Sequence, residues 1–395
     1  MIKTCSDAHI SGDAPPTGST SVIELDARNL RPQFVQEWAE LEHRALEPNI
    51  YLSPFFVLPA LSELTPDAKP ILFAVYLQET KTRKLIGVAL FTLSSPRRYF
   101  PLPHLVAYQS EHSYLSGILI DSISSKQATH ALLTHLAKPA TKWKAVRFGD
   151  CRMSGEQGQL IQEISAARGT HWHELYAYER AILRPHTVDG VAYEACIQRV
   201  GGKDMNRRIR RLSDLGQVTS RVLKGAEVTD EVITQFLKLE DREWTRQSKT
   251  SLLAAGHERF MREVCNNLRQ NSRIFVYELL LNKQVIASAM NFRSGEAGFA
   301  FKIGWDQAYA KMSPGIINEI WFMRDSPTQC SDCLYIDSGA SEGSFIDKVW
   351  PDRVKISTGL ISTSRAGNWT MWVIEGIKSV RTSLIKQLKK QEKHK

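Results

Sequence analysis

The clearest hydrophobic pattern in the chain lies between Arg273 and Phe322. Three runs rich in apolar, β-branched and aromatic residues follow one another there, separated by short polar turns: Arg273–Leu281, Gln284–Arg293 and Ala297–Trp305. Such runs predict an antiparallel meander of three strands. After a polar loop from Asp306 to Met312, apolar residues recur at helical spacing from Ser313 onward. The pattern therefore predicts a helix that follows the meander and packs on it.

The first half of the chain carries a weaker version of the same pattern. A helix and two strands are predicted in order over Pro32–Leu46, Ile71–Leu77 and Leu85–Leu93. The repetition predicts an α/β (α+β) protein with two similar halves in tandem, each a mixed, mostly antiparallel sheet flanked by helices. The expected divisions are a flexible tail over residues 1–21, domains over 22–185 and 186–365, and a basic C-terminal helix over 366–395.

The amino-acid composition is that of a globular protein and argues against a membrane-spanning or a nucleic-acid-binding one. A chain of 395 residues with 43% hydrophobic and 24% charged residues is typical of a soluble globular protein with two cores. It contains no apolar run of the ~20 residues that a membrane-spanning helix needs. The first 21 residues hold no hydrophobic core of a signal peptide, so we expect a cytoplasmic protein. The formal net charge is +9, and residues 366–395 supply a large part of it with seven Lys and Arg against two Glu. A weakly basic body argues against dedicated nucleic-acid binding.

Several kinds of site are excluded by the motifs that are missing. The chain contains no phosphate-binding Gly-x-x-x-x-Gly-Lys and no His-Glu-x-x-His. The pair Cys330 and Cys333 has no second pair with zinc-site spacing, and His171 and His173 have no third ligand nearby. We therefore expect reduced thiols and no metal site.

The start of the helix after the meander is chemically useful. Ser313 suits an N-cap, Pro314 suits the first helical position, and Gly315 would let a ligand approach the backbone. Free N–H groups in a first turn, together with the positive end of the helix dipole, favour a phosphate or pyrophosphate. The candidate anion site is therefore the backbone of the four residues from Ser313 to Ile316. Lys311 is a further candidate partner for a phosphate. The alternative is a well-capped helix without a ligand.

Three strands, a turn of small residues and a helix resemble the central arrangement of the GNAT superfamily, the GCN5-related N-acetyltransferases. The Ser-Pro-Gly turn is similar to that of the BioF2-like or CelD-like acetyltransferase domain, a relative of the FemAB-type transferases. Other segments fit the same layout: the helix at Trp38, Ser53-Pro54-Phe55, the Arg-rich helix near Arg207, Trp244, Asp337 and Lys348. The resemblance implies two tandem GNAT-like domains, the first of them degenerate.

The resemblance also implies an activity and a donor. The chain would be an N-acyltransferase that moves an acyl group from acyl-CoA, such as acetyl-CoA, to an amine of a cell-envelope or polysaccharide-related acceptor. The donor would bind along residues 313–316, between the diverging ends of the strands over 297–305 and 334–337. The acceptor would be a small molecule or a lipid- or sugar-linked one.

Two residues are candidates for catalysis. Asp337 ends a predicted strand and would take a proton from the amine or orient it. The alternative is an Asx turn that opens the loop at Ser338 and Gly339. In Fem-type relatives a lysine near the position of Lys348 stabilises the oxyanion, a task that suits a fixed ammonium. Here Asp347 stands where an aromatic residue commonly precedes that lysine.

Three further residues are candidates for acceptor binding. Arg207 and Arg211 belong to a short helix with several guanidinium groups, which can fork onto a phosphate or carboxylate. The alternative is a solvated face paired with Asp204 and Asp214. Trp244 matches a tryptophan of the family and would form a wall of the acceptor site, although burial alone would also explain it.

The sequence leaves two alternative functions possible, and it leaves two possible positions for the C-terminal helix. A FemAB-like enzyme would take an aminoacyl group from tRNA, and an inactive GNAT-like module would serve in assembly. The closing helix Trp369–Lys390 has an apolar stripe and lysines away from it. It would either lie on the inner membrane surface, making the protein peripheral there, or dock its stripe on the body, which we favour because most amphipathic helices are surface helices.

Overall fold

The computed structural model describes residues 18–80, 82–242 and 250–376. The strands of the first half are β1 (Ser19–Asp26), β2 (Ile71–Gln78), β3 (Arg83–Ser94), β4 (His104–Ala107), β5 (Leu119–Ile120), β6 (Ala145–Cys151) and β7 (Trp172–Leu183). Those of the second half are β8 (Val218–Lys224), β9 (Ile274–Leu281), β10 (Gln284–Ser294), β11 (Ala297–Trp305), β12 (Tyr335–Asp337) and β13 (Asp352–Ser362).

The helices alternate with these strands, so the α/β class predicted from the sequence is confirmed. They are α1 (Pro32–His43), α2 (Pro54–Glu63), α3 (Ser125–Leu136), α4 (Glu156–Ala167), α5 (Gly190–Arg199), α6 (Lys203–Ser213), α7 (Asp230–Glu240), α9 (Glu258–Arg269), α10 (Pro314–Gln329) and α11 (Ile346–Val349). Short 3-10 turns are η1 (Ile50–Leu52), η2 (Pro185–Thr187), η3 (Gly225–Glu227) and η4 (Gln307–Met312). β1 begins at Ser19, within the tail predicted over residues 1–21, and residues 1–17 lie outside the described residues.

The predicted meander is confirmed in β9, β10 and β11. These strands pair antiparallel in sequence order. Asn282 and Lys283, which join β9 to β10, both have positive φ angles of 49° and 68°. That conformation is the one required at both central residues of a type I′ turn, whose twist matches the strands it connects.

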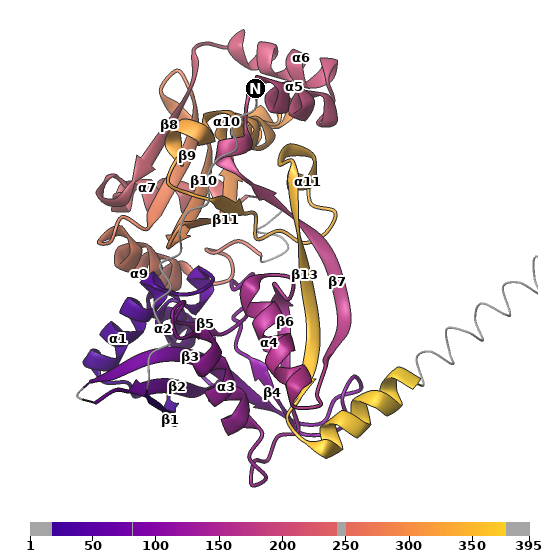
Figure 1. Cartoon of the computed structure of the whole chain (residues 1–395). Helices are drawn as coiled ribbons and strands as arrows, with labels where there is room; N and C mark the ends of the chain where they lie inside the picture. Colours follow the sequence, from indigo (N-terminus) through magenta and orange to yellow (C-terminus); the bar gives the residue numbers. More distant parts are fainter. Residues whose placement is uncertain (1–17, 81, 243–249, 377–395) are drawn as a thin grey trace, which may run out of the picture.

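One sheet runs through the described part of the chain, and the two halves exchange their last strands within it. The order is β1-β2-β3-β4-β6-β13-β7-β12-β11-β10-β9-β8, with β5 on β3. The last strand of the first half, β7, pairs with β12, and the last strand of the second half, β13, pairs with β6. β7 and β13 also pair with each other along their length and connect the halves (Figure 1). The division at residues 185 and 186 stays a prediction, and separating the halves there would break the sheet.

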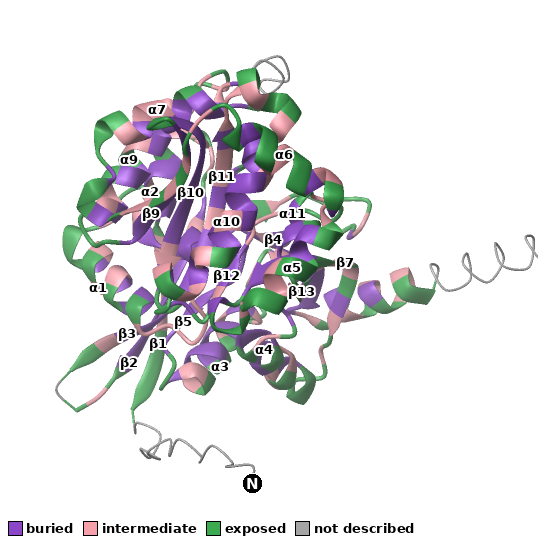
Figure 2. Ribbon diagram, turned by 90° about the horizontal axis from the view of Figure 1, so that it is seen from above, coloured by how far each residue is buried: buried purple, intermediate pink, exposed green. Residues whose placement is uncertain are grey.

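Helices cover both faces of the second half's strands. α10 packs on β9 and β10 on one face, and α7 and α9 cover the other. The strands alternate accordingly: Phe275 and Tyr277 belong to the core under α10, whereas Ile274 and Val276 belong to the core under α9. Figure 2 shows the buried residues concentrated in the strands and the exposed ones on the outer helices. This period-2 alternation is what a sheet buried on both faces requires.

The halves also meet through a shared aromatic core. α2 of the first half begins at Pro54, after Ser53 accepts a hydrogen bond from the Phe55 amide, and packs on α9 of the second half. Phe56 is fully buried, and its ring lies 5.4 Å from that of Phe260 and 6.4 Å from that of Phe292. The hydrophobic core is therefore continuous across the junction.

The described part of the C-terminal helix packs on the body by a different side from the one that the sequence suggested. Residues 365–376 are helical, and the rest of the predicted helix lies outside the described residues. Trp369 and Trp372 are 68% and 72% exposed, whereas Met371 is buried in a cluster with Phe100 and Leu360. Because the Met371 side of the helix packs on the body, the two tryptophans face outward, and their predicted docking is wrong. Within the described residues, no helix is both long and apolar enough to cross a membrane.

Candidate active site

The strands β11 and β12 separate beside a cavity. They pair in parallel from Ala297 opposite Tyr335 to Phe299 opposite Asp337, where β12 ends while β11 continues to Trp305. A cavity of about 300 Å³ lies at this divergence, lined by residues of β10, β11, α10 and the loop after β12. The opening between these strands was predicted from the sequence, and binding of a donor there stays a prediction.

The start of α10 has less free backbone than the sequence suggested. Pro314 occupies the first helical position, and Ser313 has a left-handed φ of 55° without a side-chain cap bond. The carbonyl of Ser313 accepts hydrogen bonds from the amides of Ile316 and Ile317 at 3.0 and 3.1 Å. Among the described residues, the amide of Gly315 has no hydrogen-bond partner, so it is the first-turn N–H that stays available.

Gly315 serves packing at this helix start. It is buried, and a Cβ there would lie 2.8 Å from Cδ1 of Trp305. The space that we expected a ligand to use is therefore occupied by the indole of Trp305. This corrects the interpretation of Gly315 as an open approach to the backbone.

Cationic side chains gather beside the helix start. A guanidinium nitrogen of Arg208, on α6, donates a hydrogen bond to the Ser313 hydroxyl, and the Nε of Arg208 donates to Asp204 at 2.8 Å. Lys311 is exposed on the preceding turn η4, which α6 contacts. Positive side chains at the positive end of a helix dipole favour a bound anion. Arg208 therefore connects the arginine-rich helix α6 to the helix start at Ser313, two features that the sequence analysis had treated separately.

The predicted acceptor-binding residues lie further out. Arg207 and Arg211 are exposed on α6, and Arg207 pairs with Asp204. This pairing agrees with the solvated-face interpretation for Arg207. Trp244 lies outside the described residues.

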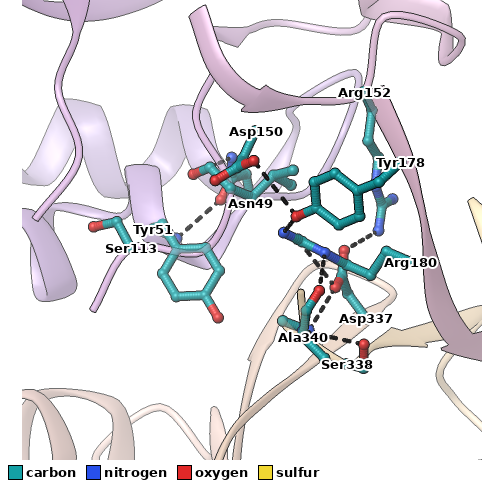
Figure 3. A network of polar contacts seen from close by, with 12 residues as sticks. Asn49, Tyr51, Ser113, Asp150, Arg152, Tyr178, Arg180, Asp337, Ser338 and Ala340 are labelled. Carbon is teal, nitrogen blue, oxygen red and sulfur yellow. Dashed lines mark hydrogen bonds and ion pairs between the residues drawn. The ribbon is translucent and has the colours of Figure 1, made fainter. Parts of the chain in front are cut away.

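Asp337 belongs to a buried ion network (Figure 3). Nη2 of Arg152 donates to its carboxylate at 2.6 Å, Nη1 of Arg180 lies at 3.5 Å, and the Gly339 amide donates at 2.8 Å. Burial raises the pKa of Asp337, but Arg180, Arg152 and the Gly339 N–H outweigh it and lower the pKa below its usual range. The bond from Gly339 confirms the predicted Asx turn. A carboxylate with a low pKa is a weak proton acceptor, so this geometry favours a structural role.

The same network ties the two halves together. Arg180 on β7 donates from Nε to the Ala340 carbonyl at 3.0 Å and from Nη2 to the Tyr178 hydroxyl at 2.6 Å. The Tyr178 hydroxyl in turn lies 3.4 Å from Asp150. Sequence reasoning missed the two arginines, because they belong to the first half and reach Asp337 only through the strand exchange.

Lys348 does not reach the cavity. It is exposed on α11, and its carbonyl oxygen accepts a hydrogen bond from Nε of Arg199 at 3.1 Å. Ile346 and Val349 occupy the buried side of that single turn, which directs Lys348 outward. Trp350, two residues further on, lines the cavity instead. A role for Lys348 at the oxyanion stays a prediction that would need α11 to move.

A carboxyl group that sequence reasoning missed lines the cavity. Glu319 is 6% exposed on α10, and its pKa is raised to about 8 by burial. Its helical position next to Ile320, within the apolar stripe, was the available signal. A charged residue on the buried side of a helix is uncommon unless it is paired or functional.

One cluster of side chains has the donor types of a metal site. Ligand atoms of Glu111, His112 and His257 lie within 4.8 Å of one another. Nε2 of His112 is 3.0 Å from Nδ1 of His257, whose Nε2 lies 3.3 Å from the Glu111 carboxylate. Burial and then the nearby Lys302 lower the pKa of His112 to about 3. The two imidazoles are hydrogen-bonded to each other, so a metal would have to replace that bond.

Comparisons with known proteins agree with this geometry. Residues 201–326, from α6 to α10, match the family model of the acetyltransferase (GNAT) domain. No curated protein matches the chain. The structure of FemX is similar at a TM-score of 0.53 and 11% identity, over 86% of this chain and 97% of that one. A conserved protein of unknown function from Bacteroides thetaiotaomicron VPI-5482 is similar at a TM-score of 0.52 and 12% identity. The match covers 87% of this chain and 99% of that one.

The site and the family match define the class of protein. The fold of the chain is shared with FemX. Residues 201–326 in its second half form a GNAT domain, which supports an N-acyltransferase.

Proposed function

We propose that the protein transfers an acyl group from acyl-CoA, with acetyl-CoA as the simplest donor, to an amine of a cell-envelope or polysaccharide-related acceptor. The observation that carries this proposal is the cavity of about 300 Å³ where β11 leaves β12. Its walls from β10, β11 and α10 belong to the GNAT domain, and α10 is the helix that begins at Pro314. The acceptor would be a small molecule or one linked to a lipid or sugar.

Two features of the site suit a coenzyme A thioester. Beyond Phe299, β11 pairs with no described residue on the β12 side, so its backbone can pair with the amides of a pantetheine arm. Lys311 and Arg208 together offer positive charge to the phosphates. Arg208 is already bonded to Ser313 and Asp204, and would supply its remaining N–H groups.

The first test is stabilisation by the donor. Acetyl-CoA should raise the melting temperature of the wild type, because a ligand present at about 100 times its Kd stabilises a native protein by about 2.7 kcal/mol. Arg208→Gln should reduce this shift. Arg259→Gln should leave it unchanged, because Arg259 has an 81% exposed side chain on α9, away from the helix start. No shift with acetyl-CoA at any concentration would contradict the proposal.

A second candidate donor is aminoacyl-tRNA. The observation that favours it is the row of exposed guanidinium groups on α6, at Arg207, Arg210 and Arg211. In that case tRNA should bind and acetyl-CoA should not. The affinity for tRNA should fall steeply as the salt concentration rises, because binding to phosphates releases counterions. A protein stabilised by neither would be an inactive GNAT-like assembly module.

We further propose that the protein works in the cytoplasm and contacts the inner membrane surface through Trp369 and Trp372. Exposed tryptophans on a helix from a basic segment suit the interface of an anionic bilayer. The wild type should sediment with phosphatidylglycerol vesicles, and less so with phosphatidylcholine vesicles. The double variant Trp369→Ala and Trp372→Ala should lose most of this binding with an unchanged melting temperature. Equal sedimentation of both proteins would contradict membrane contact.

A further inference from the structure

The cavity at the strand divergence contains one acidic side chain without a partner. The side chain of Glu319 forms no hydrogen bond or ion pair with any described residue. It lies six residues beyond Ser313 on α10, which is about 9 Å along the helix. We propose that Glu319 is the general base that takes the proton from the acceptor amine. This assignment rests on the proposed function, because it requires the thioester to lie in the cavity.

The surroundings of Glu319 distinguish it from Asp337. The cavity wall is largely apolar, with Phe301, Trp350 and Tyr114 among the residues that line it. A buried carboxyl group in such a place is costly unless it is paired or kept neutral. The Asp337 carboxylate, by contrast, is bonded by two arginines and an amide and stays ionised. Glu319 is thus the carboxyl group of this site that can both accept and return a proton near neutral pH.

The other titratable groups at the cavity do not replace it. Tyr114 is buried, and desolvation raises the pKa of its hydroxyl above the usual range, so it stays protonated. The Lys302 ammonium group donates hydrogen bonds to the Glu240 carboxylate at 3.0 Å and to the Thr250 carbonyl at 3.2 Å. On α11, which packs on α10, Lys348 is exposed and does not line the cavity. Burial keeps the pKa of Glu319 at about 8, so the fraction of ionised base grows as the pH rises towards that value.

Glu319 alone can account for both proton transfers in the reaction. A neutral amine attacks the thioester carbonyl, the carbon–nitrogen bond forms, and the Glu319 carboxylate takes one proton from the nitrogen. The carbon–sulfur bond then breaks, and Glu319 returns this proton to the leaving thiolate. The products are an amide and the free thiol of coenzyme A, and the carboxylate is restored.

The test compares the wild type with Glu319→Gln and Glu319→Asp, with Glu296→Gln as the matched control. Glu296 is an exposed residue of the turn between β10 and β11. Release of the coenzyme A thiol from acetyl-CoA is measured from pH 6 to pH 9 with methoxyamine as the probe amine, because this weakly basic amine stays neutral over the whole range. The wild-type kcat should rise about tenfold per pH unit and level off near 8. Glu319→Gln should lower it by about 10²–10⁴-fold and remove the pH dependence, a range expected for loss of a general base.

The outcomes separate the two proposals. Glu319→Asp should keep part of the activity and its pH dependence, and Glu296→Gln should match the wild type. Melting with acetyl-CoA should show the same shift in the wild type and in Glu319→Gln, which excludes a fold or donor-binding defect. A wild type without that shift would refute the proposed function itself. If acetyl-CoA binds, the assignment of Glu319 is refuted when Glu319→Gln keeps the wild-type rate and pH profile, or when the wild type releases no thiol with methoxyamine.

Discussion

Replacement of Asp337 by alanine is expected to lower the free energy of unfolding by about 3–5 kcal/mol, because removing one partner of a buried ion pair leaves an uncompensated charge. Here Arg152 and Arg180 would both lose their carboxylate, and their side chains are 11% and 2% exposed. Urea unfolding followed by circular dichroism measures the change. Asp230→Ala is the control, because Asp230 pairs with Arg269 while 69% exposed, and it should shift the midpoint little.

The pH dependence gives a second readout of the same network. The pKa of Asp337 is lower in the folded protein than in the unfolded chain. The unfolded chain therefore binds more protons in the window between the two values, and stability falls as the pH drops from the unfolded pKa of about 3.9 through the folded one. Asp337→Asn should lack this contribution, so its deficit against the wild type should shrink in acid. An Asp337→Ala variant as stable as the wild type would refute the network's structural role.

Replacement of Phe56 by alanine is expected to cost about 3–5 kcal/mol, the usual range for truncating a fully buried phenylalanine. Its ring is surrounded by Tyr51 of its own half and by Phe260, Phe292 and Phe301 of the other, at centroid distances of 5.2, 5.4, 6.4 and 6.4 Å. The loss should appear in calorimetry as a lower melting temperature with a single transition, because this core spans both halves.

A surface residue provides the comparison for Phe56. Ile123 is 66% exposed, and Ile123→Ala should change the melting temperature little. Two separate transitions in Phe56→Ala, one for each half, would still agree with the buried site but would contradict a shared cooperative core. A change as small as that of Ile123→Ala would contradict both.

The sequence by itself determined the features that depend on neighbouring residues. The meander of β9, β10 and β11 follows from alternating side chains and a two-residue turn at Asn282 and Lys283. Pro314 begins α10 because its ring has the backbone angle of a first helical residue and its missing N–H needs no partner there. These signals lie within a few residues of one another, so they are readable without the fold. With the Ser-Pro-Gly turn, they were enough to indicate the GNAT superfamily.

Only the tertiary structure decided the contacts between residues far apart in the chain. The arginines that hold Asp337, the bond between Arg208 and Ser313, and the outward position of Lys348 all depend on how distant elements pack. Helical periodicity showed an apolar stripe around Glu319, but not that an open space faces it. Burial and charge pairing are properties of the assembled sheet and helices, because a side chain's surroundings come mostly from other segments of the chain. That is why the fold class was predictable and the partners of its polar groups were not.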